Sequence, residues 1–235
     1  MAYDPVRDEI LVPGFFNFSI LTFRGDANGD VSPMRKIYGP STQLRNPEAL
    51  AVDPIHDEIF VPQADRVLVF RRTADGDAAP IRILGGPEAG LRLGRVAVDP
   101  VNNVIITAGN GFRIFDRTAQ GNVKPLRVIS GPLLGQSLMQ TYPPLGLFFA
   151  ATGRGDRHDA VDYIGVWSSL HDDGAVQARW TIGKGFFRDI RGIAIDPVSK
   201  TVIASDKTLN AVVTYHVPEI FDSPQPRQTA GVSSR

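Results

Sequence analysis

Short apolar runs alternate along this chain with polar turns, and no stretch keeps a helical period. The runs are rich in β-branched and aromatic residues and often alternate apolar with polar positions, as in SILTF (19–23), RVLVF (66–70) and FRIFD (112–116). Gly, Pro, Asp and Asn bound them, and the Asp-Gly and Asn-Gly pairs suit tight hairpins. The pattern predicts an all-β protein of short antiparallel strands.

One phrase returns along the chain. It reads MAYDPVRDEILV (1–12), LAVDPIHDEIFV (50–61), VAVDPVNNVIIT (96–107) and IAIDPVSKTVIA (193–204), and a degenerate copy, MQTYPPLGLFFA (139–150), fills the longest interval. Successive Asp-Pro prolines, or their equivalent Pro144, are then spaced by 49, 46, 44 and 53 residues. A period of this size indicates a repeat architecture in which each repeat is one supersecondary unit.

Each repeat contains four strand-like runs separated by turn signals, which is the content of one β-propeller blade. We therefore predict a five-bladed β-propeller of four-stranded antiparallel blades, with an incomplete last blade because DSPQPRQTAGVSSR (222–235) is a poor strand. The predicted single domain covers 1–222, and 223–235 is expected to be a loose tail. The repeats are expected at about 1–45, 46–91, 92–135, 136–187 and 188–222.

The stretch NPEALAVDPIHDEIFVPQADRVLVF (46–70) resembles the NHL-repeat propellers, a broad class that includes lactonase- and lyase-like enzymes. The resemblance extends over essentially the whole chain and is weakest in the fourth repeat. It departs from the class where DPIHDE replaces the usual Asp-Gly-Asn turn. Because propellers of this class often have six blades, either the ring closes with five or part of a sixth lies outside the chain.

Composition limits the function classes. The 235 residues hold 25 basic and 25 acidic side chains, which argues against bulk nucleic-acid binding. Without cysteine there are no disulfides, thiolate zinc sites or cysteine nucleophiles. No apolar run approaches the length of a membrane span, and the N-terminus does not read as a signal peptide. The compartment stays open, and it is extracytoplasmic if the chain is a trimmed mature form.

Two charged residue types recur in nearly every repeat, which favours a structural role over a catalytic one. We expect the turn aspartates to cap the Asp-Pro turns and the arginines to pair within or between blades; these residues are Asp4, Asp53, Asp99 and Asp196, and Arg35, Arg82, Arg127 and Arg179. Alternation along the middle strands places four residues in the core: Val67, Val69, Ile105 and Val212.

The loops that join strands two to three and four to one share one end of a propeller, and this loop face is the expected binding face. It carries two phenylalanine doublets, Phe15 with Phe16 and Phe186 with Phe187. Blades 1 and 5 are neighbours in a closed ring, so we expect the doublets to contact one another. They form either an apolar wall of a ligand pocket or a plug that staples the closing seam.

Arginines are frequent on the same face and suit the bidentate binding of a carboxylate or phosphate. We predict a non-catalytic module that binds a protein or a small anionic or aromatic ligand around the central channel, with no cofactor and no catalytic residue. The candidate ligand-binding residues are Phe15, Phe16, Arg45, Arg95, Arg154, Phe187 and Arg188. Loop salt bridges are the structural alternative for the arginines, and a propeller segment of a larger surface protein is an architectural one.

The alternative from another class is a lactonase- or lyase-like hydrolytic enzyme that holds Ca²⁺ or another divalent cation at the channel mouth, as the resemblance implies. The best residues for such a site are Glu48, His158 and Asp206, but arginines interrupt the acidic set and no HExxH motif is present. Stoichiometric metal in the purified protein would favour this enzyme over the binding module.

Overall fold

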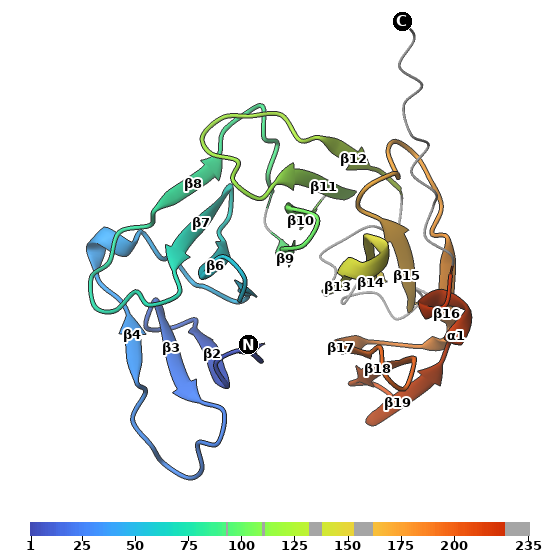
Figure 1. Cartoon of the computed structure of the whole chain (residues 1–235), viewed down its shortest axis with the longest axis horizontal. Helices are drawn as coiled ribbons and strands as arrows, with labels where there is room; N and C mark the ends of the chain where they lie inside the picture. Colours follow the sequence, from blue (N-terminus) through green and yellow to red (C-terminus); the bar gives the residue numbers. More distant parts are fainter. Residues whose placement is uncertain (93, 110, 132–137, 153–161, 224–235) are drawn as a thin grey trace, which may run out of the picture.

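Five small antiparallel sheets stand around one axis in the computed structural model (Figure 1). It describes residues 1–92, 94–109, 111–131, 138–152 and 162–223. The arrangement is the five-bladed β-propeller predicted from the repeat. The last sheet has three strands, as its sequence indicated. None of the helices in these ranges has the length and apolar character needed to cross a bilayer.

The blades follow the chain, and strands within each blade pair in sequence order. Blade 1 consists of β1 (Ala2–Asp4), β2 (Glu9–Gly14), β3 (Ser19–Arg24) and β4 (Arg35–Ile37). Blade 2 consists of β5 (Ala51–Asp53), β6 (Glu58–Pro62), β7 (Arg66–Arg71) and β8 (Arg82–Gly85). Blade 3 consists of β9 (Arg95–Asp99), β10 (Val104–Gly109), β11 (Gly111–Asp116) and β12 (Arg127–Ile129).

Blade 4 consists of β13 (Met139–Tyr142), β14 (Leu147–Thr152), β15 (Asp162–Ser168) and β16 (Trp180–Phe187). Blade 5 consists of β17 (Ile190–Asp196), β18 (Thr201–Asp206) and β19 (Ala211–His216), and the short helix α1 (Pro218–Phe221) follows it. Single 3₁₀ turns, Pro40–Thr42 and Pro143–Leu145, lie in the connections. The chain therefore builds one blade per repeat and passes to the next blade from its outer strand to an inner one.

The core lies between blades, because each sheet buries apolar residues on both faces. On blade 2, Ile59 and Phe70 pack against Leu11 of blade 1, and we call this side the backward face. Phe60 packs with Ile105 of blade 3, and we call this side the forward face. The same scheme recurs between blades 3 and 4 and between blades 4 and 5.

The recurring charged residues are structural, as predicted. Each turn aspartate accepts backbone N–H bonds from the residues two and three positions later, as Asp53 Oδ1 does from Ile55 and His56 at 2.9 Å. The same caps are present at Asp4, Asp99 and Asp196. These bonds close the Asp-Pro turn, which gives the aspartates a structural role. The second carboxylate oxygens of Asp4 and Asp53 also face Arg72 and Arg117 of the next blade, at 3.7 and 3.6 Å.

Of the predicted arginines, Arg35, Arg82 and Arg179 pair with a carboxylate of their own blade, and Arg127 donates to the Ser169 carbonyl oxygen of blade 4 at 3.4 Å. Other arginines cross between blades to the same buried carboxylates. Glu58 receives two hydrogen bonds from Arg82 of its own blade, at 2.6 and 2.8 Å, and one from Arg117 of blade 3, at 2.6 Å. Glu9 is held in the same way by Arg35 and by Arg72 of blade 2. Burial alone would raise the pKa of Glu58, but the arginine hydrogen bonds and charges outweigh it and hold the pKa below its usual value.

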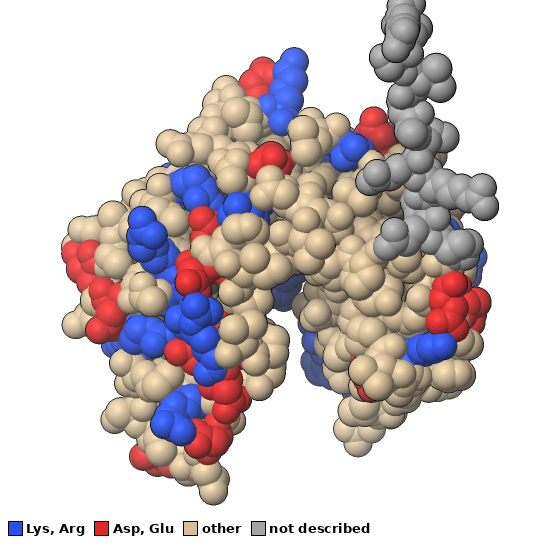
Figure 2. Space-filling model, in the orientation of Figure 1, with Lys and Arg blue, Asp and Glu red and all other residues tan. Residues whose placement is uncertain are grey.

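The ring is open between blades 1 and 5. Figure 1 places these blades on opposite sides of a gap, and the space-filling view in Figure 2 shows a notch there. The predicted core position of Val212 is wrong for this reason. It is 72% exposed on the forward face of blade 5, whereas Val67, at the same place in blade 2, is 2% exposed because blade 3 covers it.

Candidate functional site

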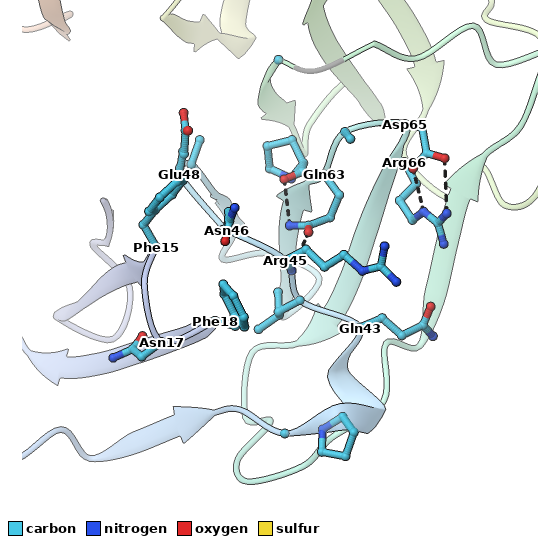
Figure 3. A pocket seen from close by; sticks show the side chains of 17 residues that line it. Phe15, Asn17, Phe18, Gln43, Arg45, Asn46, Glu48, Gln63, Asp65 and Arg66 are labelled. Atoms are coloured by element: carbon cyan, nitrogen blue, oxygen red, sulfur yellow. Dashed lines mark hydrogen bonds and ion pairs between the residues drawn. The ribbon is translucent and has the colours of Figure 1, made fainter.

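A pocket of about 790 Å³ lies on the loop face between blades 1 and 2 (Figure 3). The β2–β3 turn, the connection from β4 to β5, and the β6–β7 turn form it, so consecutive blades supply its walls. Its lining includes Phe15, Asn17, Phe18, Gln43, Leu44, Arg45, Asn46, Glu48, Gln63, Asp65 and Arg66. The size and the mixture of aromatic and charged groups are typical of a small-molecule site.

The aromatic side of the pocket comes from the β2–β3 turn. Phe15 and Phe18 both line the pocket and remain partly exposed, at 36% and 48%. Asn17 accepts a hydrogen bond from the Ser19 hydroxyl at 2.6 Å, which orders the turn between them. The rings therefore face the pocket from a short, fixed turn rather than from a long loop.

Three pocket residues hold a left-handed backbone conformation that non-glycine residues rarely adopt. These are Phe18 (φ 50°), Gln43 (φ 57°) and Asn46 (φ 45°). At the turn position of Phe18, blade 5 has Asn210, also left-handed at φ 49°. Asparagine tolerates this conformation well and phenylalanine does not, so blade 1 retains a strained aromatic residue where the repeat elsewhere uses a compatible one.

The pocket wall carries two basic and two acidic side chains: the paired Asp65 and Arg66, the Arg45 guanidinium and the exposed Glu48 carboxylate. Asp65 accepts two hydrogen bonds from Arg66, at 2.9 and 3.3 Å, and this contact is the main reason that the pKa of Asp65 lies below its usual value. The backbone N–H of Arg45 donates to Gln63 Oε1 at 2.7 Å. The Arg45 guanidinium forms no ion pair with a residue in the described ranges, as Figure 3 illustrates. It is therefore the cation available to a ligand.

Further arginines lie beside the pocket. Arg95, next to the pocket residue Gly94, donates to the Glu48 carbonyl oxygen at 3.3 Å. Burial and the nearby charge of Arg92 lower the pKa of Arg113, which shows that cationic groups of blade 3 lie close together. Arginines of blades 2 and 3 thus lie beside the pocket, together with the acidic residues Glu48 and Asp65.

The structure separates the other predicted residues from this pocket. Phe15 contacts Phe16 edge to face at 5.0 Å, but Phe16 is 92% exposed and does not line the pocket. Phe187 is fully buried in the core between blades 4 and 5 and contacts Tyr215. It lies on β16 and not in a loop, because that strand continues past Gly183 and Gly185, both at positive φ.

The expected meeting of the two phenylalanine doublets is wrong, because the open ring holds blades 1 and 5 apart (Figure 1). Phe186 contacts Phe187, and Phe15 contacts Phe16. Neither a seam plug nor a shared pocket wall is formed. Arg188 lies beyond β16 on the blade 5 side, where it donates to the Gly185 carbonyl oxygen at 3.3 Å. Arg154 lies outside the described residues.

The residues considered for a metal do not gather in one place. Glu48 is exposed at the pocket, whereas Asp206 is buried at the end of β18. Its two carboxylate oxygens accept backbone N–H bonds from Arg188, Asp189 and Leu209, at 2.7 to 2.9 Å. Burial would raise the pKa of Asp206, but these bonds lower it. His158 lies outside the described residues, and the described ranges contain no group of three or more His, Asp or Glu placed to hold a cation.

Among the predicted residues, Phe15 and Arg45 line this pocket, as does Glu48, which was considered only for a metal; the sequence did not suggest Phe18, Gln63 or Arg66. Their loops, PGFFNF, PQAD and GPSTQLRNPE, all belong to the predicted loop face. The signal that would have joined them is adjacency, because loops of consecutive blades lie side by side in a propeller. The prediction instead joined residues of blades 1 and 5, whereas the pocket lies between blades 1 and 2.

Comparison of the chain with known proteins adds no family assignment. None of the family models matches it, and no curated protein sequence matches it. The pocket and the fold are therefore the basis for the proposed function.

Proposed function

We propose that this protein is a non-catalytic binding module of the NHL-like propeller class, and that its pocket between blades 1 and 2 holds an aromatic or acidic ligand. The observation that carries the proposal is the combination of Phe15 and Phe18 with the unpaired Arg45 guanidinium in one pocket. A ligand with a ring and a carboxylate or phosphate uses both features, the ring against the phenylalanines and the anion against the guanidinium.

The backbone of the pocket supports the same proposal. Phe18, Gln43 and Asn46 keep an unfavourable conformation in one small region, and such residues tend to gather at ligand sites. A purely structural turn in this repeat has a compatible residue available, as Asn210 in blade 5 demonstrates.

Calorimetric titration of a small panel tests the proposal. Benzoate and phenylacetate are compared with benzamide and phenylacetamide, which keep the shape and remove the charge. We expect the acids to bind and the amides to bind at least about tenfold more weakly, since a charge-assisted hydrogen bond contributes about 1.5–3 kcal/mol. Equal binding of acids and amides, or no binding of either, would count against the pocket.

Matched variants locate the site. Arg45→Gln should weaken acid binding by about tenfold or more, whereas Arg188→Gln, on the other side of the open ring, should leave it unchanged. Phe15→Ser should weaken all aromatic probes, and Phe16→Ser should not, because only Phe15 lines the pocket. A dependence on Arg188 or Phe16 equal to that on Arg45 and Phe15 would place binding elsewhere.

A further inference from the structure

Each of the four blade junctions buries one forward and one backward face, but the notch between blades 1 and 5 leaves one face of each kind uncovered (Figure 2). On blade 1, Ile10 and Phe23 occupy the backward-face positions of Ile59 and Phe70. The residues of blade 2 are fully buried, and those of blade 1 are only partly buried. The uncovered face of blade 1 thus repeats the residue pattern that blade 2 buries against blade 1.

The forward face of blade 5 shows the same deficit. Val212 and Thr214 occupy the positions of Val67 and Val69 in blade 2 and are exposed, whereas those valines are buried by blade 3. Val212 is the exposed large apolar side chain of this face, and Thr214 replaces a valine there, so this face is more polar than the forward face of blade 2.

A second, independent feature lies on the outer rim of the notch. In blades 2, 3 and 4, the turn between the third and the fourth strand contains a glycine. This glycine forms two backbone hydrogen bonds with the outer strand of the preceding blade. Gly76 N–H donates to the Lys36 carbonyl oxygen and Tyr38 N–H donates to that of Gly76, both at 2.9 Å. Gly121 and Gly174 form the same pair of bonds with β8 and β12, at 2.8 to 3.1 Å.

Blade 1 has the same turn, but in the described ranges no outer strand of a preceding blade lies next to it. Gly29 has φ 76°, close to the 64°, 69° and 72° of Gly76, Gly121 and Gly174. Its flanking residues, Asn28 and Asp30, correspond to Asp75 and Asp77, which accept the backbone N–H groups of Lys36 and Ser41 at 2.8 and 2.7 Å. All three residues of the blade 1 turn are exposed, and the Gly29 N–H has no partner in the described ranges. The turn is thus preformed for an outer strand on its backward side.

We propose that the notch is a docking site for one further antiparallel β-sheet, supplied by a protein partner, with the outer strand of that sheet bound by the turn Asn28–Asp30. The sheet must be apolar on both faces, because it is sandwiched between Ile10 and Phe23 of blade 1 and Val212 of blade 5. Its outer strand must have free backbone groups, as in β-strand addition.

Two other occupants fit less well. The C-terminal residues 224–235 are too few, because each repeat of this chain takes 44 to 53 residues. A second copy would bring its own end blade together with four attached blades, and its blade 5 has no fourth strand for the Asn28–Asp30 turn. A partner sheet of the same type as these blades therefore fits the notch better than either of these two occupants.

The first test uses the existing chain, which contains no cysteine and so permits single-thiol labelling. Val212→Cys should react with a maleimide as fast as Val198→Cys, which lies in an exposed turn at 92% exposure, and Val67→Cys should react at least about tenfold more slowly. Slow labelling of Cys at position 212 in a monomer would overturn the open notch. Slow labelling together with a dimer in light scattering would assign the notch to a second copy and overturn the partner proposal.

The second test supplies a probe sheet. A copy of residues 46–95 that carries Glu58→Thr, the residue type of Thr201 in blade 5, is placed before Met1. It keeps the 46-residue spacing between turn aspartates that Asp53 and Asp99 show. In this fusion, labelling at position 212 should slow by about tenfold or more, labelling at position 198 should not change, and the amide of Gly29 should gain protection from hydrogen exchange. Gly29→Ala should reduce the protection of the turn while leaving position 212 covered.

The fusion is decisive in both directions. Protection at position 212 and at Gly29 supports a sheet docked across the notch. An added segment that exchanges as an unfolded chain while the five original blades stay protected would overturn the proposal, because the two faces would then not accept a blade of their own repeat. This outcome is independent of ligand binding at Arg45, so the two proposals can fail separately.

Discussion

Phe18 lines the pocket with a backbone φ of 50°, and this conformation can be detected by comparing two substitutions. Phe18→Ala and Phe18→Gly both remove a half-exposed ring, which costs about 1 kcal/mol of burial in each variant, roughly half of the value for full burial. Alanine keeps the left-handed penalty of about 1–2 kcal/mol, and glycine does not. Glycine gains unfolded-state entropy that lowers its stability by about 0.4–1 kcal/mol relative to alanine.

These terms give a sign that depends on the conformation. At position 18 the glycine variant should be more stable than the alanine variant by about 0.5–1 kcal/mol, since the conformational term exceeds the entropy term. Phe16 is the matched control in the same turn, because it is exposed and not at positive φ. There the order should reverse, and Phe16→Gly should be less stable than Phe16→Ala by about 0.4–1 kcal/mol.

Urea unfolding followed by circular dichroism measures all four variants, with stabilities compared at equal m values. Benzoate titration of the Phe18 variants adds the functional half of the reasoning. Phe18→Gly should retain fold stability near that of the parent chain while losing affinity for aromatic acids. If Phe18→Ala proves at least as stable as Phe18→Gly, the turn does not hold the left-handed conformation and the strain argument for the pocket fails.

The remaining predictions concern the blade junctions. Glu58→Gln should destabilise the protein by about 3–5 kcal/mol in the same urea assay, because it leaves Arg82 and Arg117 without their buried carboxylate. Asp26→Asn, at an exposed ion pair, should leave the stability almost unchanged. Glu9 and Glu58 have lower pKa values in the folded than in the unfolded protein, so both stabilise the fold above about pH 4.5. This stabilisation is lost as the pH falls through their pKa values in the folded protein. Between about pH 5 and 3 the parent protein should therefore lose more stability than Glu58→Gln. Gly94→Ala should lower the thermal midpoint by an amount equivalent to about 1–3 kcal/mol, since its new Cβ would lie 1.3 Å from the Ala108 carbonyl oxygen; an unchanged midpoint would show that the backbone there yields freely.

The sequence was informative wherever a residue type repeats. Asp53 and its counterparts predicted the turn caps, and the spacing of the Asp-Pro phrases predicted five blades. A repeated residue type predicts blade structure reliably, because each blade forms through local hydrogen bonds and a short-range alternation of apolar residues. The incomplete last blade was predictable for the same reason, since no apolar alternation follows His216.

Closure of the ring could not be predicted, because it depends on a sum of small angles between blades and not on any one residue. Val212 has the alternation of a core residue and lies in solvent, since burial there requires a neighbour that the described chain does not provide. The strand assignment of Phe187 failed for a related reason. Its GKGFF segment has the glycine content of a loop, yet Gly183 and Gly185 allow β16 to continue into the core.

Departures from the repeat indicate where blade 1 differs from the other blades, and they refine the expected docking partner. Arg72 and Arg117 each reach back to a buried carboxylate of the preceding blade. The equivalent position in blade 1 is Gly25. Its N–H donates to the Asp8 carbonyl oxygen, as the N–H groups of Arg72 and Arg117 donate to those of Asp57 and Asn103. Blade 1 therefore sends no cation across its backward face. A docked sheet with an inward carboxylate at the place of Glu58 would leave that charge with one arginine fewer, so a neutral residue there is favoured, as with Thr201 in blade 5.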